Sequence, residues 1–288
     1  MNVTAGKNTI VLKKQLTSEI TLMKFSALLI SKKAKAGQFI VIRIDEAGER
    51  IPLTFADFDS DEGSITIVFQ QVGKSTMQLA DLNEGDRVLD IIGPLGNPSE
   101  IEKCGTTMVI GGGTGIACVY PIAKALKDAG NRVISIIGAR NKQLLFWENE
   151  LAQVSDETYV TTDDGSHGRK GFVTDELGRL IDEGRKINLI YAIGPAVMMQ
   201  AVCALTEKHQ IKTVVSLNSI MVDATGMCGA CRVEVGGKTR FVCVDGPEFD
   251  GHQVNFKELT DRQKQYLEEE KVAVERYRDN QHRCECKK

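Results

Sequence analysis

The chain changes its hydrophobic rhythm once, near residue 100, and this change is the strongest constraint on its fold. Before that point, short apolar runs of strand type are separated by turn residues, and they cover residues 19–26, 38–44, 64–70 and 87–92. Short strands at this spacing are typical of an antiparallel barrel. We therefore expect a β-barrel over residues 1–100.

From residue 106 onward, apolar strand patterns alternate with helix patterns. The expected strands lie at 107–110, 133–137, 158–162 and 187–193, and the helices end near Gly130 or cover 143–154, 175–180 and 196–209. This alternation predicts an α/β domain with a parallel sheet over residues 101–212. Pro121 is expected in the first turn of the first helix. Residues 93–98, with two prolines and two glycines, are expected to form a stiff corner that continues neither kind of element.

Two smaller segments follow the α/β domain. Residues 213–255 read as a short β-like module that bears cysteines, and residues 256–288 as a polar helical tail. Apolar residues within the charged helix expected at 256–279 indicate that it packs either against a partner or back on its own chain. Cys284 and Cys286 in the tail read as free thiols or as an adventitious metal site.

Asp223, Cys228, Cys231 and Cys243 form the most specific motif. Their spacing matches the C-x4-C-x2-C…C pattern of plant-type [2Fe–2S] sites, with aspartate in the place of the first cysteine. Glycines 226 and 229 suit a loop that needs positive φ and close N–H to sulfur approaches. A Cys3Asp zinc site or a turn beside an unrelated core cysteine are the alternatives, but zinc sites usually present paired ligands on both sides.

A glycine-rich turn follows the first strand of the α/β domain and opens a helix; its residues are Gly111, Gly112, Gly113, Thr114 and Gly115. Such a turn places backbone N–H groups and the positive helix end against a pyrophosphate. A tight packing turn is the alternative, because the spacing is not G-x-G-x-x-G. Gly194 and Pro195 end a later strand and are expected on the same rim, while residues 162–166 form either part of that rim or a polar surface turn.

Two motifs in the barrel also suggest ligand contacts. Residues 50–54, Arg-Ile-Pro-Leu-Thr, form a constrained strand entry, and Gly73, Ser75 and Thr76 belong to a glycine-hydroxyl turn able to donate to phosphate. The neighbouring Gly-Lys-Ser-Thr string is not a P-loop, because Val68 stands where the upstream glycine is required.

The composition excludes several classes of function. A net charge of −3 over 288 residues gives no basic surface for nucleic acid. The first 25 residues lack the apolar core of a signal peptide and no apolar run reaches membrane-spanning length, so we expect a cytoplasmic protein. Cys104, Cys118 and Cys203 are expected as small core residues, and His252 and His282 as solvated histidines. No acid–base constellation emerges, as expected where cofactors perform the chemistry.

Together these motifs resemble the ferredoxin–NADP reductase superfamily, in the branch that holds the dihydroorotate dehydrogenase electron-transfer subunit and the small subunit of NADH-dependent reduced ferredoxin:NADP oxidoreductase. The resemblance implies FAD on the barrel, NAD(H) on the α/β domain and a [2Fe–2S] module. By it, the flavin contacts are Ile51, Pro52, Leu53 and Thr54 at the isoalloxazine, Val68, Phe69 and Gln70 along the next strand, and Ser75 and Thr76 at the pyrophosphate. Arg50 is displaced by one position from the family pattern, which leaves its contact with the flavin phosphates open.

The resemblance also implies an activity and a partner. FAD would exchange a hydride with NAD(H), and the cluster would pass single electrons to a larger subunit with a second FAD and [4Fe–4S] clusters, resembling a glutamate synthase small subunit. The heteromeric complex would couple NADPH oxidation to reduction of NAD⁺ and ferredoxin. Asp223 favours this branch member over the dihydroorotate-linked one, which uses four cysteines. The choice between NAD and NADP stays open at the residues, because Arg140 and Lys142 could favour a 2′-phosphate.

Overall fold

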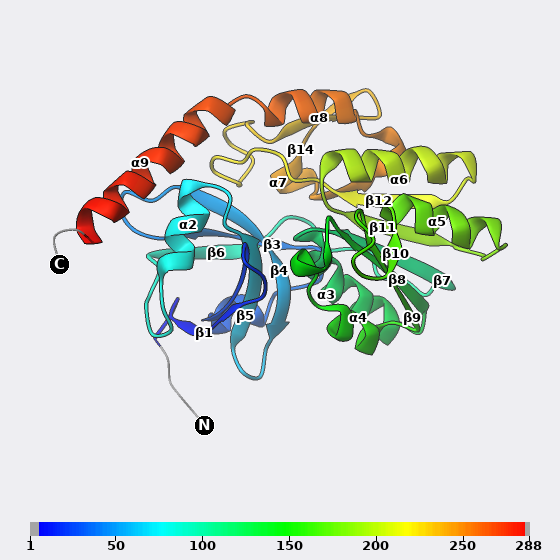
Figure 1. The fold of residues 1–288 in the computed structure, drawn as a ribbon, viewed down its shortest axis with the longest axis horizontal. Coiled ribbons are helices and arrows are strands. Elements are labelled where there is room, and N and C mark those ends of the chain that lie inside the picture. Colours follow the sequence, from blue (N-terminus) through cyan, green and yellow to red (C-terminus); the bar gives the residue numbers. More distant parts are fainter. Residues whose placement is uncertain (1–5, 286–288) are drawn as a thin grey trace.

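The computed structural model describes residues 6–285, with side chains described up to residue 280. Figure 1 shows three parts: the blue and cyan strands at one side, a green sheet covered by helices at the other, and a yellow and orange segment that lies against both. The red C-terminal helix crosses back from this last segment to the first.

Within the described residues, the first part is a six-stranded antiparallel sheet in the order β1-β2-β5-β4-β3-β6. Its strands are β1 (Ile10–Gln15), β2 (Ile20–Ser26), β3 (Phe39–Arg43), β4 (Arg50–Asp59), β5 (Ser64–Gln70) and β6 (Asp90–Leu95), with the short helices α1 (Leu28–Ser31) and α2 (Lys74–Asp81). A bridge between Thr9 and Arg87 joins its two ends, so the sheet curls into the predicted barrel. Apolar side chains fill its interior, among them Phe25, Ile40 and Phe55.

The prediction of a corner at residues 93–98 is wrong for residues 93–95, because strand β6 continues through Gly93 and Pro94 to Leu95. The strand tolerates the proline because it lies at the end of the strand order, where a lost ladder hydrogen bond costs least. Its pairing with β3 shifts register between Phe39 and Val41, opposite this segment.

Within the described residues, the second part is a seven-stranded sheet in the order β10-β9-β8-β7-β11-β12-β15, parallel except for β15. Its strands are β7 (Thr106–Gly112), β8 (Arg132–Ala139), β9 (Glu157–Thr162), β10 (Arg169–Lys170), β11 (Leu189–Ile193), β12 (Lys212–Ser216) and β15 (Glu248–Asp250). The helices α3 (Gly115–Asp128) and α4 (Glu148–Val154) lie below the sheet in Figure 1, and α5 (Val173–Asp182) and α6 (Ala196–Lys208) above it. The parallel sheet with crossover helices is confirmed.

Two helix predictions need correction. Pro121 lies inside α3 beyond its first turn, because that helix already begins at Gly115. The helix expected at 143–154 is broken into the turn η1 (Lys142–Leu144) and α4, since Trp147 adopts a left-handed backbone with φ of 57°. A pattern of apolar spacing does not reveal a single residue in that conformation.

The cysteine-bearing segment is tied to the large sheet at its end. It contains the hairpin β13 (Arg232–Val235) and β14 (Lys238–Phe241), then α7 (Val242–Asp245), and then β15, which pairs antiparallel with β12. The turn η2 (Gly251–Gln253) leads into the tail. The cysteine loop is therefore anchored by a strand of the nucleotide sheet rather than attached by a flexible linker.

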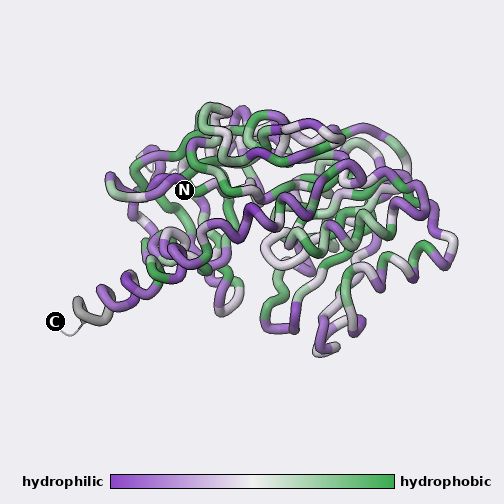
Figure 2. Tube along the Cα trace, turned by 90° about the horizontal axis from the view of Figure 1, so that it is seen from above, coloured by the Kyte–Doolittle hydropathy of each residue, from purple (hydrophilic) through white to green (hydrophobic). Residues whose placement is uncertain are grey.

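The tail forms two helices rather than one, α8 (Phe256–Gln263) and α9 (Leu267–Glu285). Phe256 and Leu259 of α8 are buried in the core shared with α6. α9 runs to α2 of the barrel, where Tyr277 Oη donates to Asp81 Oδ2 at 2.5 Å, and Figure 2 shows it largely purple. Of the two predicted placements, the structure shows the tail folded back on its own chain. Cys286 lies outside the described residues, as do the side chains of Cys284 and His282.

The two sheets share an apolar boundary. Ile20, Leu22 and Val68 of the barrel belong to the same buried cluster as Val109 of β7 and Ile116 of α3. A continuous buried cluster holds these parts in a fixed relation. In the part of the chain that is described, no helix has the length and apolar character to cross a membrane.

Candidate cofactor and electron-transfer site

A cavity of about 500 Å³ lies at the carboxyl ends of the parallel strands. Most of its lining comes from the nucleotide sheet, namely Gly112, Gly113, Gly138, Ala139, Arg140, Leu144, Thr161, Asp163, Phe172, Val173, Thr174, Pro195, Val197, Met198 and Ala201. Ile20 and Gln70 are contributed by the barrel. The crevice beyond the strand ends is where open α/β sheets bind their ligands, and here it also touches the barrel.

The glycines of the glycine-rich turn have two roles: some allow close packing of the chain, and one faces the cavity. A Cβ on Gly111 would lie 2.8 Å from Ile116 Cα, and one on Gly115 would lie 2.0 Å from the Ile193 oxygen, so both glycines allow close packing of the chain itself. Gly113 has φ of 56° and a Cβ there would meet no atom within 4 Å. Among these described glycines, Gly113 is the one that combines positive φ with open space at the cavity.

The second loop, Gly194 and Pro195, lies beside this turn as the sequence predicted. A Cβ on Gly194 would come within 3.1 Å of the Gly112 oxygen and 2.7 Å of Met198 Cε. Gly113 N–H donates to the Gly138 oxygen at 3.2 Å, which ties the turn to the end of β8. Thr114 precedes α3 as its N-cap residue without a side-chain capping bond.

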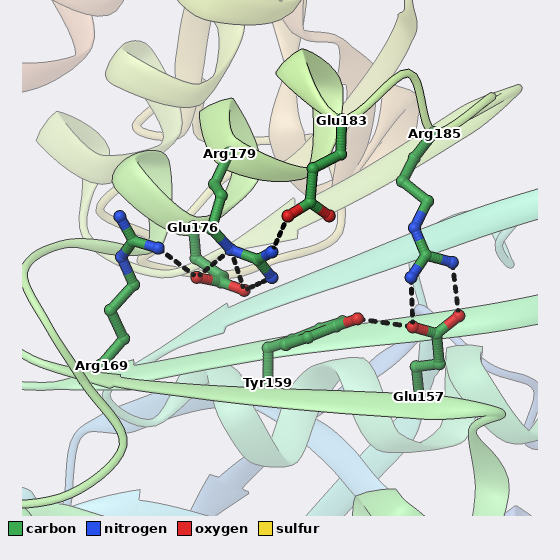
Figure 3. A network of polar contacts seen from close by, with 7 residues as sticks. All are labelled: Glu157, Tyr159, Arg169, Glu176, Arg179, Glu183 and Arg185. Carbon is green, nitrogen blue, oxygen red and sulfur yellow. Dashed lines mark hydrogen bonds and ion pairs between the residues drawn. The ribbon is translucent and has the colours of Figure 1, made fainter.

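Behind the wall formed by Phe172, Val173 and Thr174, a charged network lies between β9 and α5 (Figure 3). Glu176 is buried at 3% exposure and binds Arg179, with Arg169 Nη1 3.6 Å away. The Arg179 guanidinium lies 5.5 Å from the Tyr159 ring centroid. The hydrogen bond and the charge of Glu176 raise the pKa of Arg179, which keeps the guanidinium positively charged.

The same network continues along the sheet edge. Tyr159 Oη donates to Glu157, which also accepts hydrogen bonds from Nη1 and Nη2 of Arg185, at 3.0 and 3.2 Å. Removing an arginine partner of the buried Glu176 would leave an uncompensated buried charge, which is strongly destabilising. The start of α5 was not predicted as a ligand wall, since only the tertiary fold brings it to the glycine-rich turn and shows that Phe172 is exposed there.

On the barrel side, β4 presents its two faces to different neighbours. Ile51 and Leu53 pack against the barrel core, so Pro52 and Thr54 face the other way, as alternate residues of a strand must. The Thr54 hydroxyl hydrogen-bonds Cys118 of α3, whose thiol also contacts the Thr114 oxygen at 3.7 Å. Burial raises the pKa of Cys118 to about 11.

The next barrel strand contributes differently at each position. Val68 packs in the cluster shared with the nucleotide sheet, and Gln70 lines the cavity. Phe69 is 2% exposed in the barrel interior, so its ring does not reach the cavity. The alternation of strand side chains separates these three consecutive residues.

The glycine-hydroxyl turn is the start of α2, a helix the sequence did not predict. Thr76 Oγ1 accepts from Gly73 N–H at 3.1 Å, and Ser75 Oγ donates to Glu49 at 2.6 Å. A Cβ on Gly73 would meet nothing within 4 Å. Ser75 must exchange its bond to Glu49 before it can donate to a phosphate.

The cysteine loop has the backbone that a cluster requires. Gly226 and Gly229 have φ of 86° and 68°. Cys231 and Cys243 bring their sulfurs to 3.2 Å, longer than a disulfide at about 2.05 Å. Ala230 N–H lies 3.5 Å from Cys228 Sγ and Cys243 N–H lies 3.5 Å from Cys231 Sγ. N–H groups directed at sulfur stabilise thiolates that hold iron, so these residues fit an iron–sulfur cluster.

Asp223 is placed differently from the three cysteines. Its Oδ1 accepts from Thr225 Oγ1 at 3.0 Å and its Oδ2 from Cys228 N–H at 2.8 Å, and hydrogen bonds to Thr225 and Cys228 lower its pKa. The carboxylate therefore closes the loop in this structure. Among the described residues, no three Asp, Glu, Cys or His side chains surround one metal position.

The structure corrects the expected environments of Cys104, Cys118 and His252 and confirms that of Cys203. Cys203 is buried as expected, and burial raises its pKa to about 12, whereas Cys104 is exposed and Cys118 only partly covered. His252 is not simply solvated, because its Nε2 lies 2.9 Å from Thr206 Oγ1 of α6. Thr206 in turn accepts from Thr213, so these side chains tie α6 to the end of the sheet.

A barrel beside a parallel nucleotide sheet, followed by a cysteine loop, defines a ferredoxin-reductase-like protein with an iron–sulfur module. Phthalate dioxygenase reductase, 16% identical with a TM-score of 0.56 over 79% of this chain, shares the fold. Family models match residues 109–204 as an oxidoreductase NAD-binding domain and residues 218–255 as the iron–sulfur cluster binding domain of dihydroorotate dehydrogenase B.

The chain belongs to the family of dihydroorotate dehydrogenase B electron-transfer subunits. It is 49% identical to the Thermotoga maritima protein named as a homolog of that subunit, over 94% of this chain and 95% of that protein. The electron-transfer subunit of dihydroorotate dehydrogenase B from Geobacillus thermodenitrificans is 36% identical over 83% of this chain and 92% of its own length. This chain is an oxidoreductase subunit of that flavin- and iron–sulfur-containing, NAD-dependent family, which acts in heteromeric complexes.

One solved structure extends the comparison. A chain in the structure of NADH-dependent reduced ferredoxin-NADP oxidoreductase, a study of flavin-based electron bifurcation, is 48% identical with a TM-score of 0.91. The match covers 96% of this chain and 99% of that one. The predicted fold class and family resemblance are therefore confirmed.

Proposed function

We propose that this chain is the NAD(H) arm of an electron-bifurcating, NADH-dependent ferredoxin:NADP oxidoreductase in the cytoplasm. Its partner would be a larger subunit, resembling a glutamate synthase small subunit, with a second FAD and [4Fe–4S] clusters. When bound, FAD would exchange a hydride with NAD(H), and the [2Fe–2S] cluster would carry electrons singly towards that partner. The complex would link NADPH oxidation to reduction of NAD⁺ and ferredoxin.

The observation that carries this proposal is the shared cavity. Gly113 and Pro195 come from the nucleotide sheet and Gln70 from the barrel, yet all three line one space. A nicotinamide nucleotide held at the strand ends would thus lie against the barrel, where Pro52 and Thr54 face α3. Hydride transfer needs such direct apposition, because positioning the reacting groups supplies much of the rate.

We assign the cofactor contacts by the same geometry. Gly111, Gly112, Thr114 and Gly115 would shape the pyrophosphate turn around Gly113, with Gly194 and Pro195 opposite. Ile51, Pro52, Leu53, Thr54, Val68, Phe69 and Gln70 would form the flavin strands, and Gly73, Ser75 and Thr76 the flavin pyrophosphate end. Of these, Ile51, Leu53 and Phe69 would contribute through their backbone, because their side chains pack in the barrel interior. The open space at Gly73 and the positive end of α2 support the last assignment.

We assign the cluster to Asp223, Cys228, Cys231 and Cys243. The sulfurs of Cys231 and Cys243 lie 3.2 Å apart, and the Asp223 carboxylate accepts from the Cys228 backbone N–H. A [2Fe–2S] cluster has two irons that each take two protein ligands, so we pair Cys231 with Cys243 and Asp223 with Cys228. Asp223 must exchange its bonds to Thr225 for iron.

The second candidate is an electron-transfer subunit of dihydroorotate dehydrogenase, favoured by relatives such as the 36% identical Geobacillus subunit. The bifurcating oxidoreductase chain is 48% identical over 96% of this chain, more than the Geobacillus subunit, and this supports the first candidate. The 49% identical Thermotoga protein is named as a homolog of the second. Substrates separate the two. The anaerobically purified complex should reduce ferredoxin from NADPH only when NAD⁺ is present. Reduction of NAD⁺ by dihydroorotate, with no reaction from NADPH, would establish the second candidate instead.

A further inference from the structure

The charge of Arg140 at the nucleotide cavity is already engaged by the barrel. Arg140 follows β8, the second strand of the nucleotide sheet in chain order, and it lines the cavity. In doubly wound folds an arginine in this region accommodates the 2′-phosphate of NADP. Here its Nη2 lies 3.9 Å from Glu19 Oε2, at the start of β2.

Glu19 is held in place by its own part of the molecule. Gln70 Nε2 donates to Glu19 Oε2 at 2.8 Å, and Gln71 N–H donates to the Glu19 backbone oxygen at 2.9 Å. Gln70 and Ile20, the next residue in the chain, both line the cavity. The Glu19 side chain is therefore held next to two residues that line the cavity.

A second carboxylate lies on the same side. Asp163 lines the cavity, and its N–H donates to the Ala139 oxygen at 3.1 Å, while Asp164 N–H donates to the Arg140 oxygen. The loop after β9 thus holds acidic residues against the end of β8. A 2′-phosphate would bring about two further negative charges into this surrounding, whereas a ribose 2′-hydroxyl brings none.

We propose that Glu19 is a specificity-determining residue that makes the site select NAD(H) over NADP(H), by drawing the Arg140 guanidinium towards the barrel and away from a bound 2′-phosphate. The inference rests on the proposed nicotinamide site. Arg140 considered without Glu19 would instead indicate a preference for NADP(H). The discriminating charge comes from the barrel, so cofactor choice depends on how the barrel and the nucleotide sheet are held together.

Glu19→Gln in the full-length chain, purified without the partner subunit, tests the proposal, because the partner proposed above would oxidise NADPH at its own site. The variant keeps an oxygen for Gln70 and loses the charge. We expect the ratio of kcat/KM for NADPH to that for NADH in flavin reduction to rise roughly fivefold, since exposed ion pairs are worth up to that factor in affinity. The matched control is Glu62→Gln, which breaks the barrel ion pair to Lys24 at 2.7 Å and should leave the ratio unchanged.

The double variant Glu19→Gln with Arg140→Ala completes the test. The gain should disappear, because the freed guanidinium is what would bind the 2′-phosphate. An unchanged ratio in Glu19→Gln, a gain that survives Arg140→Ala, or a wild type that prefers NADPH each overturns the proposal. A wild-type flavin reduced by neither nucleotide overturns the proposed function itself, and the inference with it.

Discussion

Gly113 offers the sharpest test of the nucleotide site, because strain and ligand contact can be separated there. Its φ is 56°, and a Cβ at this position would meet no protein atom within 4 Å. The perturbation is Gly113→Ala. Gly184 is the matched control, since it has φ of 77°, equally open space, and a place at the end of α5 in the same part of the chain.

The expected magnitudes follow from this geometry. An L-residue in the left-handed region costs about 1 kcal/mol at either position, which lowers Tm by roughly 2–4 °C in a domain of about 150–250 residues. Only the methyl at 113 projects into the cavity. If it pushes the pyrophosphate away from one backbone N–H, the lost charge-assisted hydrogen bond costs about 1.5–3 kcal/mol, roughly ten- to hundredfold in affinity.

Stopped-flow reduction of the bound flavin by NADH measures the effect, with thermal melts and flavin and iron content as companions. We expect Gly113→Ala to raise the apparent Kd for NADH at least tenfold with full cofactor content. Gly184→Ala should share the Tm loss and keep the wild-type Kd. Equal NADH kinetics in both variants would show that Gly113 does not face the nucleotide.

Three further predictions concern the cluster, the boundary and the tail. Asp223→Cys should assemble a [2Fe–2S] cluster with a lower midpoint potential and an altered electron paramagnetic resonance spectrum, because thiolate donates more electron density than carboxylate. Asp223→Ala should make the cluster labile. If Asp223→Ala leaves the spectrum and the potential unaltered, Asp223 is not a ligand of the cluster. Burial raises the pKa of Glu248 to about 7, with a smaller contribution in the same direction from the charge of Glu100, although the hydrogen bond from Ser99 acts in the opposite direction. Because the folded state then binds more protons than the unfolded one, stability should fall as pH rises from about 4.5 to 7, by no more than about 3 kcal/mol, and Glu248→Gln should flatten this slope in thermal melts. Deletion from Lys264 onward removes α9 but keeps Phe256 and Leu259 of α8, so flavin and iron should be retained. If α9 contacts the partner, less partner should co-purify with the shortened chain. A complex that stays intact would mean that α9 serves its contact with α2 and not the partner.

The sequence by itself determined the order of the parts and the type of each. Alternating short runs before residue 100 predicted the barrel, and the strand and helix rhythm after it predicted the parallel sheet, because these periodicities record which side chains must be buried. The spacing of Cys228, Cys231 and Cys243 predicted the cluster module. Local spacing is informative there because the ligands of one loop lie close together in the chain.

Tertiary structure decided which of the predicted residues meet, and where. Gly111 and Gly115 serve the packing of α3 while Gly113 faces open space, a division that depends on Ile116 and Ile193 from other elements. The pairing of Arg140 with Glu19 joins residues 121 positions apart (140 − 19) across two sheets. A sequence pattern reports the burial of each residue along its own element; contacts between distant elements depend on how whole layers pack, which no local spacing encodes.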